Sequence, residues 1–190
     1  AQVIKALLDR NPNLPEDSID DVVLGCAFPE GPQGMLMARS VSVLAGIPIG
    51  AGAKVVNRFC GSSMDSVHQL SQAIEAGDID MGIAAGVEDM FGVPMGGFNP
   101  DFNPELAENN FYMGMGETAE NLAEDGNISR EDQESFAMNS HLKALAAQKD
   151  GKFDNEIVAI SNNGSTIEKD EGPRDPDEEK IKSLSPAFLE

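Results

Sequence analysis

A strand–helix–strand pattern between residues 53 and 87 constrains the fold of this chain more than any other feature. Residues 53–59 have the composition of a short strand, and residues 63–76 carry apolar side chains at helical spacing up to a helix stop at Gly77. Residues 80–87 are predicted to form a second strand, whose small side chains suit a buried position. A strand, a helix and a strand within this length form one crossover between parallel strands. The sequence therefore predicts an α/β fold with a buried parallel sheet.

Further patterns extend this α/β unit in both directions. The segment 91–110 holds three prolines and little periodicity, which indicates a long loop of a functional or oligomer-forming kind. Beyond it, Ser129 and Asp132 have the spacing of a helix-capping box. Apolar periodicity predicts helices at 2–10, 34–45, 118–125 and 129–149 and strands at 19–27 and 156–160.

The charge of the chain argues against one broad class of function. With 13 basic and 33 acidic residues the formal charge is −20, which disfavours nucleic-acid binding. Seven acids, three bases and two prolines in residues 168–180 predict a solvated loop. Hydrophobic residues make up 41%, enough for a globular core, and no apolar stretch has the length that a bilayer requires. These features predict a cytoplasmic protein without a membrane span.

The two cysteines, Cys26 and Cys60, cannot make a disulfide-rich scaffold, so reduced thiols are expected. Neither His68 nor His141 combines with them at the spacing of metal ligands, and we predict no metal site. The sequence also contains no dinucleotide-binding fingerprint and no Walker motif. We therefore expect no permanently bound cofactor.

Cys60 stands between the predicted strand and the first turn of the predicted helix. Unsatisfied backbone N–H groups and the helix dipole favour an anion at such a position. Positions of this kind can lower the pKa of a thiol from about 8.5 to about 3.5–7.5. A small buried hydrophobic cysteine is the alternative on residue type alone. The context at Cys60 favours a nucleophile.

The sequence around Cys60, VVNRFCGSSMDSVH at 55–68, closely resembles the nucleophile motif of thiolases, in particular the degradative 3-ketoacyl-CoA type. The resemblance continues, in the family's order, through GVEDMFGVPMGGFNP at 86–100, MGETAENLAEDGNISREDQESFAMNSH at 115–141 and GKFDNEIVAI at 151–160. It therefore covers nearly the whole chain. Condensing enzymes such as ketoacyl synthases share the strand–Cys–helix geometry but lack the blocks in 115–141.

The resemblance implies the layered thiolase fold. Residues 1–90 would form one αβα half with a mixed or parallel sheet, without its first strand, and residues 91–190 an inserted loop domain that covers coenzyme A. The family's Gly-His-Pro and Cys-x-Gly-Gly-Gly motifs, which lie in its C-terminal half, do not occur in the sequence. We expect the chain to be the N-terminal half of a thiolase, with the C-terminal domain absent, and to be inactive alone.

The resemblance also implies a reaction. Cys60 would take the acyl group from a 3-ketoacyl-CoA and pass it to free coenzyme A as co-substrate, which gives acetyl-CoA and a shortened acyl-CoA in fatty-acid β-oxidation. Met115 matches a methionine beside the acyl pocket, and Arg174 resembles an arginine near the adenine and phosphate end of coenzyme A. A core methionine and a solvated loop arginine are the respective alternatives. His68 and His141 are expected to be structural.

The expected partners follow from the family as well. Thiolases form homodimers and often homotetramers, and a hydratase/dehydrogenase subunit of β-oxidation is a possible further partner. A different class of function stays open, in which the chain is a non-catalytic remnant that dimerises or binds coenzyme A. The two hypotheses differ in their thiols, because a catalytic Cys60 reacts much faster than Cys26, whereas a remnant has two slow, buried cysteines.

Overall fold

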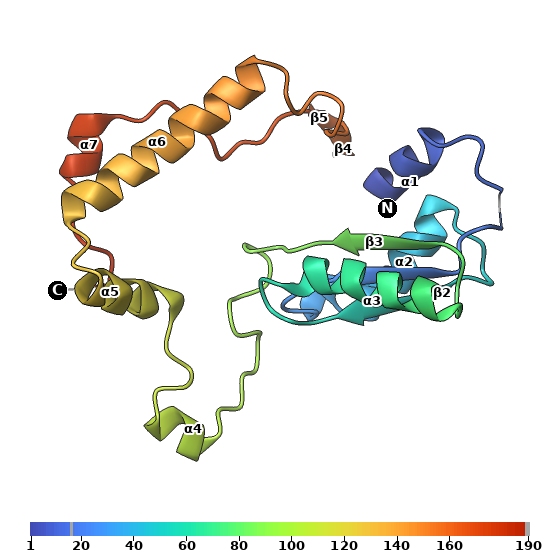
Figure 1. The fold of residues 1–190 in the computed structure, drawn as a ribbon, viewed down its shortest axis with the longest axis horizontal. Coiled ribbons are helices and arrows are strands. Elements are labelled where there is room, and N and C mark those ends of the chain that lie inside the picture. The colour runs from blue at the N-terminus through green and yellow to red at the C-terminus, as the bar shows by residue number, and fades with distance from the viewer. Residues whose placement is uncertain (16, 189–190) are drawn as a thin grey trace. The chain divides into compact units, whose positions relative to one another are not determined.

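The computed structural model describes residues 1–15 and 17–188 and divides into two compact units, Ala1–Asp101 and Phe102–Glu190 (Figure 1). We describe each unit by itself. The sequence placed the domain boundary after residue 90, whereas the compact units divide after residue 101. Contacts with the first unit explain the difference. Val93 is 2% exposed, and the Phe98 N–H donates to the Glu30 carboxylate over 2.9 Å.

The first unit contains a three-stranded parallel sheet with strand order β2-β1-β3. In this register Val22 of β1 lies between Ala53 of β2 and Ile83 of β3. The predicted α/β class with a parallel sheet is confirmed. The elements are α1 (Gln2–Asp9), β1 (Asp21–Gly25), the 3₁₀ helix η1 (Gly31–Gln33), α2 (Met37–Ala45), β2 (Gly52–Val56), α3 (Ser62–Ala76) and β3 (Gly82–Gly86).

One face of this sheet carries the apolar core. Val22, Ile83 and the half-buried Ala53 pack with residues of α1, of α2 and of the loops beside them. β1 is the buried strand, with Val22 and Val23 fully inaccessible to solvent. The prediction that residues 80–87 are buried is wrong for most of β3, because that strand lies at the edge of the sheet and only Ile83 in it is buried. The other members of the buried cluster are Ile4, Ile19, Ala45, Ile47 and Ala51.

Helix α3 packs on the opposite face, where small residues allow a close approach. A Cβ atom added at Gly25 would overlap the backbone of Ser62, and one added at Gly82 would overlap the side chain of Leu70. Residues 21, 23 and 25 alternate with Val22 along β1, so they face α3 while Val22 faces the core. Because these glycines have no side chains, α3 can pack close to the sheet.

The second unit contains four helices and one hairpin among the residues that the structure describes. The elements are α4 (Pro104–Glu108), α5 (Met115–Asp125), α6 (Arg130–Lys149), β4 (Ile160–Asn162), β5 (Ser165–Ile167) and α7 (Glu178–Lys182). The capping box predicted at the start of α6 is confirmed, because the Asp132 N–H donates to Ser129 Oγ over 3.1 Å and the Ser129 N–H donates to Asp132 Oδ2 over 3.3 Å.

The strand predicted at 156–160 is wrong. A strand begins only at Ile160 and pairs with β5 through an antiparallel hairpin. Asn163 and Gly164 have positive φ angles of 48° and 85°, which suit the two central residues of a tight hairpin turn. This local turn, rather than the apolar run before it, fixes where the strands lie.

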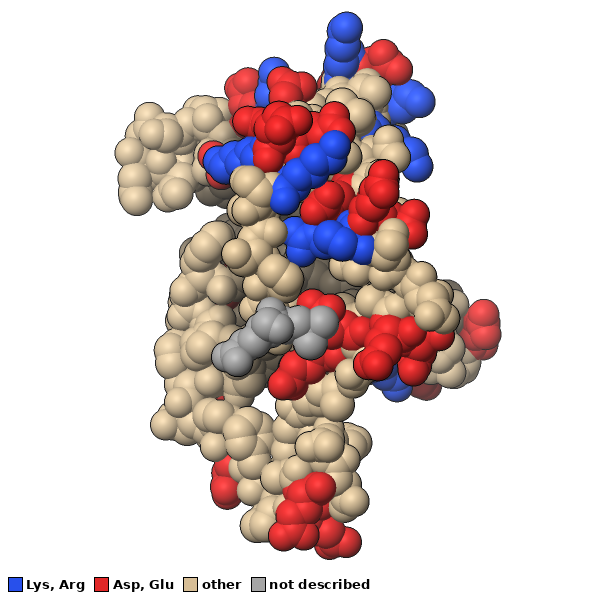
Figure 2. All heavy atoms as spheres, turned by 90° about the vertical axis from the view of Figure 1, so that its left-hand side faces the viewer, with Lys and Arg blue, Asp and Glu red and all other residues tan. Residues whose placement is uncertain are grey.

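The prediction of a solvated loop at residues 168–180 is confirmed in part. Residues 168–177 form neither helix nor strand and are almost all exposed, but 178–182 form α7. Asp177 explains this helix, because its Oδ1 accepts from the Lys180 N–H over 3.0 Å. Figure 2 shows acidic side chains in several clusters on one face of the molecule, some of them with basic residues in between. No helix in the described residues is long and apolar enough to cross a membrane.

Candidate active site

Cys60 lies at the carboxyl edge of the parallel sheet, between the end of β2 and the start of α3. The ends of β1 and β3 meet at the same edge, which is where ligands bind in open parallel sheets. Both thiols are free. Cys60 is exposed, whereas Cys26, which follows β1, is 1% exposed. The predicted nucleophile is therefore the thiol that a substrate can reach.

Ser62 fixes the backbone turn that presents Cys60. Its side chain is buried, and its Oγ accepts from the Arg58 N–H over 2.8 Å and donates to the Phe59 carbonyl over 2.6 Å. Phe59 has a φ of 45°, in the left-handed region that costs a bulky residue about 1–3 kcal/mol. The Ser62 hydrogen bonds hold this strained residue directly before Cys60.

A buried carboxylate anchors the same turn from the side of α3. Asp65, in the first turn of α3, is 8% exposed and forms an ion pair of 3.0 Å with Arg58. Its second oxygen accepts from Gln69 Nε2 over 2.8 Å. A negative charge near a helix N-terminus is favourable. Asp65 thus stabilises both the helix start and the position of Arg58, two residues before Cys60.

Asn57 connects the turn to the loop that follows β1. Its Nδ2 donates to the Ala27 carbonyl over 2.8 Å, and its Oδ1 accepts from the Phe59 N–H over 2.9 Å. The rings of Phe28 and Phe59 are also in contact, with centroids 5.8 Å apart. The loop at 26–28 therefore packs against one side of the turn that presents Cys60.

Glu88, just after β3, fixes the loop at 26–28 through hydrogen bonds. Its carboxylate accepts from the Ala27 N–H over 2.7 Å, the Phe28 N–H over 3.4 Å and Gln33 Nε2 over 2.9 Å. Gln33 is 1% exposed, and its side chain also donates to the Phe28 carbonyl and accepts from the Asp89 N–H. Three segments of the chain meet at this carboxylate.

The two ionisable groups of this cluster have shifted pKa values. Desolvation raises the pKa of the Cys26 thiol, and the nearby Glu88 carboxylate adds to the increase. For Glu88, desolvation alone would raise the pKa, but the hydrogen bonds from Ala27, Gln33 and Phe28 outweigh it and lower the pKa below its usual value. At neutral pH, Cys26 is thus a thiol and Glu88 a carboxylate.

We expect Glu88→Gln to destabilise the protein at neutral pH but not in acid. The cost at pH 7 is about 1 kcal/mol, low for bonds to a charged group because solvent screens this carboxylate. Since the folded-state pKa lies below the unfolded value of about 4.3, the contribution is present above that pH and is lost as the pH falls through the folded pKa. Urea unfolding of both proteins at several pH values measures it, and a constant difference down to the lowest pH would contradict this account.

The other predicted site residues lie in the second unit. Met115 is the first residue of α5 and is 63% exposed. Arg174 is exposed, and its backbone N–H donates to His141 Nδ1 over 3.3 Å. Cys60 belongs to the first unit, so these residues are described separately from it. Met115 and Arg174 stay predictions, and His141 contacts the segment that contains Arg174.

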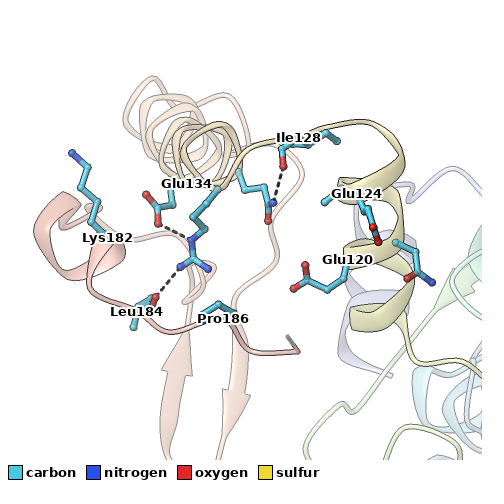
Figure 3. Close-up of a pocket in the computed structure, with 11 residues that line it drawn as sticks. Glu120, Glu124, Ile128, Glu134, Lys182, Leu184 and Pro186 are labelled. Carbon is cyan, nitrogen blue, oxygen red and sulfur yellow. Dashed lines mark hydrogen bonds and ion pairs between the residues drawn. The ribbon is translucent and has the colours of Figure 1, made fainter. Parts of the chain in front are cut away.

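The second unit has two adjoining hollows beside α6. Figure 3 shows the first, of about 580 Å³, between α5, α6 and the segment that reaches Pro186. Arg130 is one of the residues that line this hollow. Its side chain forms an ion pair with Glu134 over 2.7 Å and donates to the Leu184 carbonyl over 3.1 Å. The second hollow shares these residues and extends to Arg174.

Sequence reasoning overlooked most of the residues that support Cys60. Glu88, Gln33 and Asn57 are ordinary polar residues, and the hydrogen bonds that join their segments span 30 to 62 positions along the chain. The one available signal is that 60 and 88 fall directly after predicted strands, whereas 57 lies inside the strand predicted at 53–59 and follows β2 only in the structure. In a parallel sheet, residues at such positions gather at one edge.

Comparisons with known proteins agree with the geometry. The family described as "Thiolase, N-terminal domain" matches residues 1–190. The chain is 41% identical to the 3-ketoacyl-CoA thiolase of Marinomonas sp. (strain MWYL1), over 100% of the chain and 50% of that protein. For the 3-ketoacyl-CoA thiolase of Shewanella sp. (strain MR-7) the identity is 45%, over 99% and 50%. For that of Shewanella denitrificans it is 47%, over 88% and 44%.

The chain thus spans about half the length of the curated relatives it matches. The matched half contains the parallel sheet, the α3 helix and the cysteine turn that the structure describes. The chain belongs to the thiolase family and carries its N-terminal domain.

Proposed function

We propose that Cys60 is the nucleophile of a 3-ketoacyl-CoA thiolase. The observation that carries the proposal is the exposed thiol of Cys60 at the N-terminus of α3, on a turn fixed by Ser62. Backbone N–H groups and the dipole at this helix end favour the thiolate. Because Cys26 is buried and its pKa is raised, Cys60 is the better nucleophile of the two thiols.

The proposed reaction has two acyl transfers. The Cys60 thiolate adds to the 3-keto carbon, the C2–C3 bond breaks, and its electron pair goes to the enolate of acetyl-CoA, which takes up a proton. The acyl group is then a thioester on Cys60. Free coenzyme A attacks this thioester, which gives a shortened acyl-CoA and regenerates the thiol. Coenzyme A is a substrate here and not a resident cofactor.

Met115 and Arg174 are proposed to bind the substrate. Met115 would contact the acyl chain, because its exposed thioether adapts to apolar groups. Arg174 would bind the adenine and phosphate end of coenzyme A. Support for this role comes from its hollow, which Lys180 also lines, so two cationic side chains could meet phosphates there. The hollow also contains Glu134, which is paired with Arg130, and Asp177.

The reaction needs groups beyond Cys60. A base that activates the thiol and an acid for the enolate are required, and these 190 residues contain neither a Gly-His-Pro nor a Cys-x-Gly-Gly-Gly sequence. We therefore propose that these residues alone accept an acyl group but do not turn over. The proposal includes a homodimer or homotetramer that works in cytoplasmic fatty-acid β-oxidation, with a hydratase/dehydrogenase subunit as a further partner.

Alkylation with iodoacetamide between pH 5 and 9, with each cysteine mapped by mass spectrometry, tests the proposal. We expect Cys60 to react at least about tenfold faster than Cys26 at pH 7, because Cys60 is exposed at a helix N-terminus and Cys26 is buried. A non-catalytic remnant predicts two slow thiols. If Cys60 reacts no faster than Cys26 across this pH range, the preorganised nucleophile is wrong.

A further inference from the structure

We propose that Glu88 is a positioning residue for Cys60, which it reaches through Ala27 and Asn57. This inference rests on the proposed role of Cys60 as nucleophile. Glu88 follows β3, whereas Cys60 follows β2. Three hydrogen bonds along the carboxyl edge of the sheet lead from Glu88 to the residue before Cys60.

The first step is the set of hydrogen bonds between Glu88 and the loop after β1. One oxygen, Oε2, accepts from the Ala27 N–H over 2.7 Å. The other oxygen, Oε1, accepts from Gln33 Nε2 over 2.9 Å and faces the Cys26 thiol at 3.8 Å. Such charge-assisted bonds are short and directional. They fix the peptide of Ala27 on its N–H side.

The second step passes from this peptide to the cysteine turn. The carbonyl of Ala27 accepts from Asn57 Nδ2 over 2.8 Å, so the residue whose N–H Glu88 holds presents its oxygen to Asn57. Asn57 lies directly after β2, three positions before Cys60. A displacement of Ala27 would move the acceptor of Asn57 and rotate its amide.

The third step is the effect of Asn57 on the strained residue before the thiol. Asn57 Oδ1 accepts from the N–H of Phe59 over 2.9 Å, and Phe59 has a φ of 45°. A strained conformation persists only when the surroundings over-determine it. Ser62 holds the carbonyl side of Phe59, and Asn57 holds its N–H. If Asn57 moves, Phe59 can relax and Cys60 leaves the helix N-terminus.

The test is a double-mutant cycle on the alkylation rate of Cys60 in the whole chain. Glu88→Gln is isosteric, keeps an acceptor for Ala27 and points an N–H₂ group at the N–H₂ of Gln33. Asn57→Ala removes the side chain that connects the Ala27 carbonyl to the Phe59 N–H. Asp89→Asn is the matched control, because it removes the same charge one position away and its Oδ1 accepts from the Phe91 and Gly92 N–H groups, outside the route to Cys60.

We expect Glu88→Gln and Asn57→Ala each to slow alkylation of Cys60 at pH 7 by about 3- to 10-fold, because the thiol then leaves the helix N-terminus. The double variant should be no slower than the slower single variant, because both act through one route. Loss of a negative charge by itself would favour a nearby thiolate and speed alkylation, so the expected slowing has the opposite sign. Asp89→Asn should change the rate by less than twofold.

Three results would overturn the positioning role. These are an unchanged alkylation rate of Cys60 in Glu88→Gln, additive effects in the double variant, and an equal effect of Asp89→Asn. A merely structural loosening would expose Cys26 to faster alkylation and would not slow Cys60, whereas the positioning role predicts a slower Cys60 with Cys26 still protected. If Cys60 is already slow in the unmodified protein, the proposed function fails instead, so the two failures are distinguishable.

Discussion

Replacing Cys60 by serine should lower thiolysis at least about 1,000-fold in any active protein that contains this chain, as loss of a nucleophile does in other acyl-transfer enzymes. A serine hydroxyl is far less acidic than a thiol, so it supplies almost no anion at neutral pH. The helix end that favours a thiolate cannot compensate for this difference. Acetyl-CoA production from a 3-ketoacyl-CoA and free coenzyme A measures the effect.

The other thiol provides the comparison for this prediction. Cys26→Ala removes a thiol that is buried beside Glu88, and we expect it to lower the rate by less than about tenfold, through packing alone. Equal losses in Cys60→Ser and Cys26→Ala would show that neither thiol has a special role. Retention of activity in Cys60→Ser would remove Cys60 from the mechanism.

Gly25→Ala is expected to destabilise the first unit by about 3 kcal/mol, at the upper end of overpacking costs, because backbone atoms block the new methyl group. The added Cβ would overlap the backbone of Ser62 and Ser63, which cannot rotate away as a flexible side chain can. The N-terminal turn of α3 must then rise from β1 and carry Cys60 with it. Urea unfolding measures the stability, and the alkylation rate of Cys60 measures the displacement.

Gly50→Ala is the matched control for this substitution. Nothing lies within 4 Å of a Cβ atom at Gly50, and its φ does not lie in the left-handed region. We expect no loss of stability there and a gain of up to about 1 kcal/mol from the less flexible unfolded chain. If Gly25→Ala is as stable as Gly50→Ala, the contact between β1 and α3 does not set the position of Cys60.

The sequence was most informative where one local pattern determines one element. The crossover from β2 through α3 to β3 was predictable because its apolar spacing, its helix stop at Gly77 and its small residues all agree. The cysteine turn was found for the same reason, from its place between a strand and a helix. The capping box of α6 needs only Ser129 and Asp132, three positions apart.

The sequence was least informative where a distant contact or a turn determines the position of an element. The apolar run at 156–160 favoured a strand, but the left-handed pair Asn163 and Gly164 places the hairpin later. The exposure of β3 follows from its edge position, which periodicity does not reveal. The hydrogen bonds of Glu88 join three segments of the chain, and no spacing rule predicts them.

Acyl loading measures the central claim most directly. The purified chain is incubated with an acyl-CoA thioester, and the modified residue is identified by peptide mass spectrometry. Transfer between two thioesters needs only a reactive thiol and backbone donors, and Cys60 offers an exposed thiol at the start of α3. We predict one acyl group, on Cys60, that free coenzyme A removes. Acylation of Cys26 to the same extent, or no acyl group on Cys60, would contradict the assignment of Cys60 as the nucleophile.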